Sequence, residues 1–122
     1  MDQTENAYQP KGLEVTSAVA DDGVTVVSVS GEIDHNSAGP LVHALEPDSL
    51  GGRLRVVVDM RQVTFMDSTG INVLLSAHRD LDHAGGWLRL ADVQTSVMRI
   101  IDIVGVHHII PCHSSLEDAL AA

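Results

Sequence analysis

A strand-like pattern that passes directly into a helical pattern is the feature that most constrains the fold of this chain. The junction is the segment 63–71, Val-Thr-Phe-Met-Asp-Ser-Thr-Gly-Ile, where two hydroxyls, an acid and a glycine separate the two patterns. We expect Ser68 to cap the helix that begins there, because a hydroxyl can accept hydrogen bonds from free backbone N–H groups of the first turn. The same N–H groups and the helix dipole would favour a phosphate at this position. Ser68 is therefore a candidate modification site.

The composition is that of one small domain with an aliphatic core. A chain of 122 residues suits a single core, and its only aromatic residues are Tyr8, Phe65 and Trp87. The net charge of −10 argues against nucleic acid as a partner, because that binding depends on Lys and Arg contacts with phosphates. No apolar run approaches the roughly 20 residues that span a bilayer, so we expect no membrane partner. The single cysteine, Cys112, excludes an internal disulfide and favours a cytoplasmic location.

Strand and helix patterns alternate along the chain with short loops between them. The predicted strands are 13–20, 24–30, 54–59, 87–91 and 108–112, and the predicted helices are 38–45, 68–83, 94–104 and 115–120. A turn at 21–23 makes the first two strands an antiparallel hairpin, whereas the later alternation implies parallel pairing. We therefore expect a single α/β domain over 13–120, with a mixed sheet and about four helices. Residues 1–12 lack an apolar period and are expected to form a flexible tail.

Local signals mark several of the expected helix ends. Asn36 and Ser37 are candidate caps of the first helix. Gly105 follows the third helix at a position where a left-handed residue commonly ends a helix. Ser114 and Glu117 have the spacing of a capping box and predict the start of the last helix.

Two motifs of this chain resemble those of anti-sigma factor antagonists of the STAS domain class. The motifs are Gly-Glu-Ile-Asp-His at 31–35 and Phe-Met-Asp-Ser-Thr-Gly-Ile at 65–71, and the resemblance covers about 13–120. It implies that Ser68 matches the family's phosphoacceptor and that the unphosphorylated protein captures an anti-sigma factor, which is also its ATP-dependent serine kinase. Capture would release a sigma factor, and a phosphoserine phosphatase would restore the free hydroxyl. Thr69 stands where a second serine is common, which leaves open whether Thr69 is also modified.

Residues around Ser68 are candidate contacts for such a partner. The two nearby acids could orient the acceptor hydroxyl or the nucleotide of the kinase, or could simply cap loops and helices. Glycine in a first helical turn costs about 1 kcal/mol relative to alanine, which indicates a close backbone approach or a sharp turn. The helix face that continues from Ser68 could extend the contact surface or could be a solvated face. The candidate partner-binding residues are Asp34, Asp67, Thr69, Gly70, Asn72, Val73, Ser76 and Arg79.

Charge alone provides a mechanism for a switch at Ser68. A phosphate adds about −1.5 to −2 charges at a helix end where the dipole favours anions, so we expect the helix to persist. The effect would fall on the partner, because one like-charge contact at about 4 Å costs on the order of 4 kcal/mol at an effective dielectric of 20. That energy corresponds to roughly a thousandfold loss of affinity.

Other functions fit the sequence less well. Ser68 lacks the Gly-x-Ser-x-Gly elbow of a hydrolase nucleophile, and the chain has no Gly-rich loop ending in Gly-Lys-Ser or Gly-Lys-Thr, so we expect no enzyme. The segment 107–113, His-His-Ile-Ile-Pro-Cys-His, suggests zinc ligands, but an extended strand would separate them too far for one ion. We therefore expect no metal and no cofactor. A scaffold module of a larger complex, without regulated phosphorylation, remains the alternative.

Overall fold

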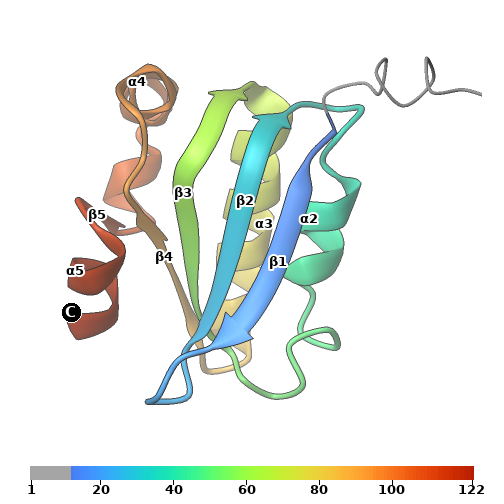
Figure 1. The fold of residues 1–122 in the computed structure, drawn as a ribbon, viewed down its shortest axis with the longest axis vertical. Helices are drawn as coiled ribbons and strands as arrows, with labels where there is room; N and C mark the ends of the chain where they lie inside the picture. Colours follow the sequence, from blue (N-terminus) through green and yellow to red (C-terminus); the bar gives the residue numbers. More distant parts are fainter. Residues whose placement is uncertain (1–11) are drawn as a thin grey trace, which may run out of the picture.

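A single five-stranded sheet organises the computed structural model, which describes residues 12–122 (Figure 1). The strands are β1 (Glu14–Val19), β2 (Thr25–Ile33), β3 (Arg55–Met66), β4 (Trp87–Ala91) and β5 (Cys112–His113). The helices are α2 (Gly39–Ala44), α3 (Ser68–His83), α4 (Thr95–Val104) and α5 (Leu116–Ala121), with a 3-10 turn, η1 (Val106–His108). The expected flexible tail at 1–12 lies outside the described residues apart from Gly12, and a domain start at Leu13 stays a prediction.

The strands lie in the order β1-β2-β3-β4-β5, so sequence neighbours are also spatial neighbours. β1 and β2 pair antiparallel, and every later pair is parallel. This arrangement confirms the predicted α/β fold, with a hairpin followed by parallel strands and four α-helices among the described residues. None of these helices is long and apolar enough to cross a membrane.

Two aliphatic clusters hold the sheet and its helices together. The main core lies on the face covered by α2 and α3 and also includes buried residues of α4 (Figure 1). Its largest fully buried side chains include Ile33, Leu41, Met60, Leu74, Leu81, Leu88, Leu90, Ile101 and Ile110. On the opposite face, α5 contacts β3, β4 and β5 through a smaller cluster around Val57, Ala91 and Ala119. The part of that face formed by β1 and β2 carries no helix among the described elements, which leaves it open (Figure 1).

β3 is longer than the sequence predicted. The predicted strand ended at Asp59, whereas β3 continues to Met66 and pairs with β2 along its second half. The pairing register shifts twice, once between Ser28 and Ser30 and again between Gly31 and Glu32. β3 has an extra residue at each of these bulges, and the extra residues break the regular alternation of buried and exposed side chains. The hydrophobic pattern of the sequence therefore did not predict the second half of the strand.

The last strand is shorter and later than the predicted 108–112, because β5 covers only Cys112–His113 and residues 108–111 are not a strand. Gly105 ends α4 with a left-handed backbone (φ 88°), as predicted, and the chain then turns through η1. Val106 O accepts hydrogen bonds from Ile109 N and Ile110 N, both at 2.8 Å, so the segment coils where a strand was expected. The strand-spacing argument against zinc therefore does not apply. Among the described residues, no group of three or more His, Cys, Asp or Glu side chains is placed to hold a metal ion.

Two of the predicted helix caps are also corrected. Ser115, and not Ser114, caps α5: its hydroxyl accepts a hydrogen bond from Asp118 N at 3.0 Å. The helix starts one residue later because Ser115 has the extended backbone that a cap requires. α2 begins at Gly39 without a side-chain cap, since Asn36 and Ser37 belong to a preceding turn.

Candidate functional site

Ser68 is the first residue of α3, and its side chain is exposed. The expectation that Ser68 caps the helix is wrong, because Asp67 occupies the cap position. Asp67 has an extended backbone (φ −106°, ψ −166°), and its Oδ1 accepts a hydrogen bond from Thr69 N at 2.9 Å. Since the preceding acid performs the capping, the Ser68 hydroxyl is left at the surface of the first turn.

The ends of two parallel strands fix the position of Asp67 and Ser68. Asp67 N donates a hydrogen bond to Ile33 O, the last residue of β2, at 3.2 Å. Ile71 N in turn donates to Asp67 O at 3.3 Å and continues the helix. The carboxyl ends of β2 and β3 therefore lie at one edge of the sheet, at the top of Figure 1. This edge places Asp34, the residue after β2, in the same region as Ser68.

Asp34 organises the loop that follows β2. Its Oδ1 accepts hydrogen bonds from Asn36 N at 2.9 Å and from Ser37 N at 3.0 Å. The Ser37 hydroxyl accepts from Asp34 N at 3.0 Å and donates to Glu32 O at 2.6 Å. The Asn36 N–H is the main cause that lowers the pKa of Asp34 below its ordinary value of 3.8, with the Ser37 hydrogen bonds adding to it. Asp34 thus has a structural role in this loop, and a contact with a partner stays a prediction.

Gly70 is buried beneath the first turn of α3. A Cβ atom added there would overlap Met66 Cγ and would lie 3.0 Å from Ile33 Cγ2. Its φ is not positive, so the close approach, and not a sharp turn, explains the glycine. Because Gly70 is covered by its neighbours, a partner cannot contact it directly. Gly70 can therefore affect partner binding only by fixing the position of the first turn of α3, which carries Ser68.

A groove between α2 and α3 collects several of the candidate partner-binding residues. Thr69, Asn72, Val73 and Ser76 all line it, together with Val42, Leu45, Glu46, Ala77 and Asp80. Its volume is about 350 Å³, and it begins at Thr69, next to Ser68. Arg79 does not line the groove, and its Nη2 donates a hydrogen bond to Ser76 Oγ at 3.4 Å.

Sequence reasoning missed two apolar side chains that the fold exposes near this site. Val42 is 42% exposed on the α2 side of the groove, and Phe65 is 48% exposed near the end of β3. Exposed aromatic residues commonly anchor protein interfaces. The position of Phe65 just before the Asp-Ser-Thr motif was the one available signal, in a chain with so few aromatics. Val42 gave no such signal, because the exposed side of α2 depends on how the helix packs.

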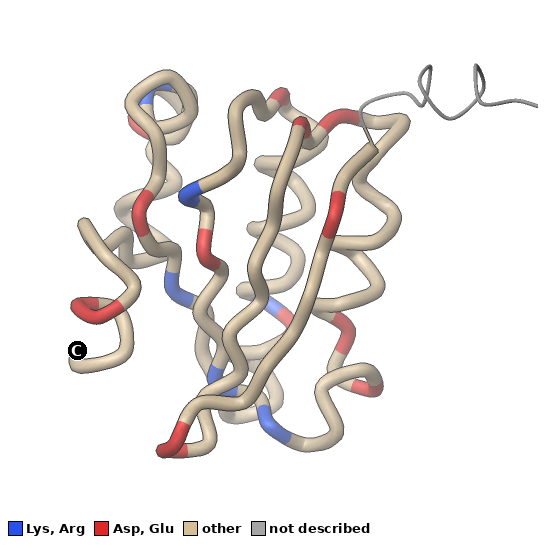
Figure 2. Tube along the Cα trace, viewed as in Figure 1, with Lys and Arg blue, Asp and Glu red and all other residues tan. Residues whose placement is uncertain are grey.

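The edge that carries Ser68 is acidic. The segments 30–37 and 65–72 contain three acids and no Lys or Arg, and Figure 2 shows acidic positions where β2 and β3 end. A phosphate on Ser68 would add to this negative charge. The site therefore has a negative potential, which would become more negative on modification.

Comparison with known proteins identifies relatives over nearly the whole chain. The STAS domain family model matches residues 16–119. The Anti-sigma-B factor antagonist of Bacillus subtilis (strain 168) is 34% identical over 92 residues, which cover 75% of this chain and 83% of that protein. The Anti-sigma F factor antagonist of Paenibacillus polymyxa is 30% identical over 100 residues, covering 80% of this chain and 85% of that protein. The crystal structure of an anti-sigma factor antagonist from Mycobacterium paratuberculosis superposes with a TM-score of 0.82 at 29% identity, covering 93% of this chain and 95% of that one.

Proposed function

Because this chain belongs to the STAS domain family, we propose that it is an anti-sigma factor antagonist that phosphorylation of Ser68 switches off. In this proposal the unphosphorylated protein binds an anti-sigma factor and so frees a sigma factor. The anti-sigma factor is also the ATP-dependent serine kinase, and a phosphoserine phosphatase reverses the modification. The protein acts in the cytoplasm as a binding protein and a kinase substrate, and it catalyses no reaction itself.

The single observation that carries the proposal is the exposed Ser68 hydroxyl at the start of α3, beside the α2–α3 groove. A kinase needs an accessible hydroxyl, and a switch needs that hydroxyl next to the surface that the partner covers. Because Asp67 already caps the helix, a phosphate on Ser68 does not need to replace a structural hydrogen bond. The helix dipole favours the added charge, so the modified protein keeps its fold.

The proposed contact surface has an apolar floor and a polar rim. Val42, Leu45 and Val73 provide the apolar part of the groove, and Glu46 and Asp80 provide charge at its lining. An anti-sigma factor with an apolar segment for this floor, and with basic side chains opposite Glu46 and Asp80 and away from Ser68, would complement both features. Phosphorylated Ser68 then opposes binding where the partner's backbone or an acidic group comes close, since a like-charge contact at about 4 Å costs on the order of 4 kcal/mol at a dielectric of 20.

Phosphate transfer from a cognate kinase tests the proposal. The protein is incubated with labelled ATP and with candidate anti-sigma ATPases from its own genome, and the modified residue is mapped by mass spectrometry. We expect a single phosphate on Ser68, with loss of labelling in Ser68→Ala. Ser96→Ala is the matched control, because Ser96 is also exposed in the first turn of a helix, α4. Labelling on Thr69 alone, or capture of the ATPase that is equal before and after phosphorylation, would contradict the switch.

A further inference from the structure

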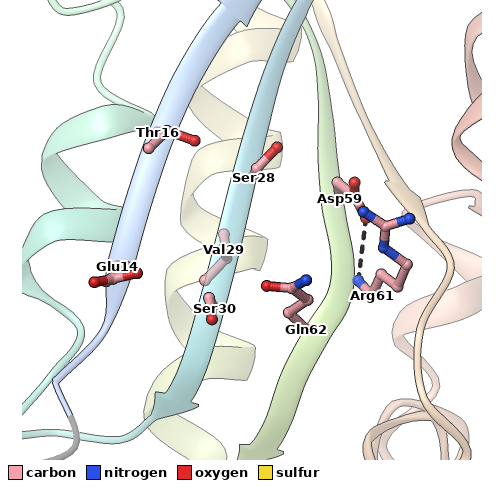
Figure 3. A pocket seen from close by; sticks show the side chains of 8 residues that line it. All are labelled: Glu14, Thr16, Ser28, Val29, Ser30, Asp59, Arg61 and Gln62. Atoms are coloured by element: carbon pink, nitrogen blue, oxygen red, sulfur yellow. Dashed lines mark hydrogen bonds between the residues drawn. The ribbon is translucent and has the colours of Figure 1, made fainter.

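A polar hollow lies on the open face of the sheet, opposite α2 and α3 (Figure 3). Its volume is about 180 Å³, and β1, β2 and β3 all contribute to it. The residues that line it are Glu14, Thr16, Ser28, Val29, Ser30, Asp59, Arg61 and Gln62. None of them lines the groove beside Ser68, so the hollow is separate from the proposed partner site.

Asp59 is the unusual member of this set, because it is a carboxylate only 9% exposed in the middle of a sheet. Its one hydrogen bond among the described residues is at Oδ1, which accepts from Arg61 N at 3.1 Å. None of the ion pairs found in the described part of the chain includes Asp59. Arg61 lines the same hollow but forms no ion pair with Asp59 in the described part of the chain. A buried carboxylate without a paired cation is costly, so a group that supplies positive charge directly to Asp59 would be bound favourably.

The backbone of β3 holds Asp59 in this position. Ser28 pairs with Asp59 and Ser30 pairs with Gln62, so β3 has one extra residue at a bulge. Arg61 lies in the bulge, where its N–H donates to Asp59 Oδ1 and its carbonyl oxygen accepts from Gln94 Nε2 at 2.9 Å. Bulges often redirect side chains beside functional sites. Here the hydrogen bonds with Asp59 Oδ1 and Gln94 Nε2 hold the bulge in place. Asp59 lines the hollow, and its Oδ2 forms no hydrogen bond among the described residues.

We propose that this hollow binds a small molecule that carries a protonated amine, with the ammonium group against Asp59. A second carboxylate, Glu14, lines the same hollow, so two carboxylates stand against the one guanidinium of Arg61, and the net negative charge favours a cation over an anion. The hydroxyls of Thr16, Ser28 and Ser30 can accept hydrogen bonds from the ammonium or donate to a hydroxyl of the ligand. A volume of about 180 Å³ is below the range for drug-sized ligands, so the ligand is the size of an amino alcohol or a small amino acid.

Amide chemical-shift titrations of the full chain test this site. Ethanolamine is the probe, and ethylene glycol and glycolate are its neutral and anionic counterparts of similar size. We expect saturable shifts of the Ser28, Ser30 and Gln62 amides with ethanolamine and no saturable shift with either counterpart. Asp59→Asn should weaken ethanolamine binding at least about tenfold, since it removes the charge and keeps the shape. Asp48→Asn, at an exposed acid in the loop between α2 and β3, should leave the affinity unchanged.

A second variant keeps the test decisive if Asp59→Asn does not fold. Thr16 is exposed on β1, and in Thr16→Arg the new guanidinium would enter the hollow and compete for Asp59. We expect Thr16→Arg to abolish ethanolamine binding without changing phosphorylation of Ser68. Equal shifts with ethylene glycol, or no saturation with ethanolamine at millimolar concentrations, would overturn the proposal. Both variants leave the Ser68 edge untouched, so their results are independent of the proposed partner switch.

Discussion

Asp67 Oδ1 accepts a hydrogen bond from Thr69 N at 2.9 Å, and this one contact assigns different tasks to two adjacent residues. Asp67 performs the structural task of capping α3, whereas Ser68 presents a hydroxyl to solvent. A phosphate on Ser68 therefore changes the surface without removing the cap. This separation would allow one strand-to-helix junction both to stabilise the fold and to serve as the proposed switch.

Removal of the cap should destabilise the protein without removing the acceptor hydroxyl. We expect Asp67→Ala to lower the free energy of unfolding by about 1 kcal/mol, because Thr69 N loses its partner. Asp67→Asn should keep most of that stability, since its amide oxygen can accept the same hydrogen bond. Urea unfolding followed by circular dichroism measures both. Asp80→Ala, at an exposed position late in α3, is the control and should change stability by less than half as much.

Phosphorylation should leave the helix intact while it abolishes partner capture. The dipole at the start of α3 favours the added charge of about −1.5 to −2, so the circular dichroism spectrum should keep its helical signal. Affinity for the anti-sigma factor should fall by roughly a thousandfold, as expected for one close like-charge contact. A large loss of helical signal on modification would instead mean that the phosphate acts by unfolding the first turn.

Phe65 and Val42 should contribute to partner binding and little to stability. Each is an exposed apolar side chain near the proposed contact surface, at 48% and 42% exposure respectively. We expect Phe65→Ala to weaken binding of the anti-sigma factor at least about tenfold, as for an interface anchor, and Val42→Ala to weaken it less. Ile103→Ala is the control, because Ile103 is 83% exposed on α4, a helix that contributes no residue to the groove. Titration calorimetry would refute the assignment if all three variants bound alike.

Gly70 should not tolerate a methyl group. In Gly70→Ala the new Cβ would overlap the Met66 side chain, so we expect a loss of about 1–3 kcal/mol in spite of the higher helix propensity of alanine. Gly39→Ala is the matched control, since no atom apart from its chain neighbours and the backbone of α2 lies within 4 Å of the corresponding Cβ. That variant should lower stability less than Gly70→Ala does. Thermal unfolding of the pair separates the steric effect from propensity.

The loop after β2 should loosen in acid. The folded protein lowers the pKa of Asp34, so its contribution to stability is present above the unfolded value and is lost as pH falls through the folded value. Amide shifts of Asn36 and Ser37, which donate to Asp34 Oδ1, should therefore titrate below the ordinary value of 3.8. In Asp34→Asn the same amides should show no such transition. A transition that persists in this variant would assign the titration to another acid.

Local sequence patterns determined the order and type of the elements, although not the full length of β3 or the position of β5. Periodicity and turn chemistry depend on neighbouring residues, so they were sufficient for the hairpin, the alternation of strands and helices, and the left-handed Gly105 after α4. The motif around Ser68 likewise marked the start of α3, although the sequence assigned the cap to the wrong one of two adjacent polar residues. Both can cap a helix, and only the backbone conformation of each decides which one does.

Tertiary structure alone decided which side chains meet. The bulges that extend β3 depend on its register with β2, and the coil at 106–110 depends on the burial of Val106 and Ile110. The groove beside Ser68 exists because α2 packs next to α3, and the hollow around Asp59 exists because three strands present polar side chains on an uncovered face. Contacts between residues far apart in the chain depend on packing energies that no local pattern contains.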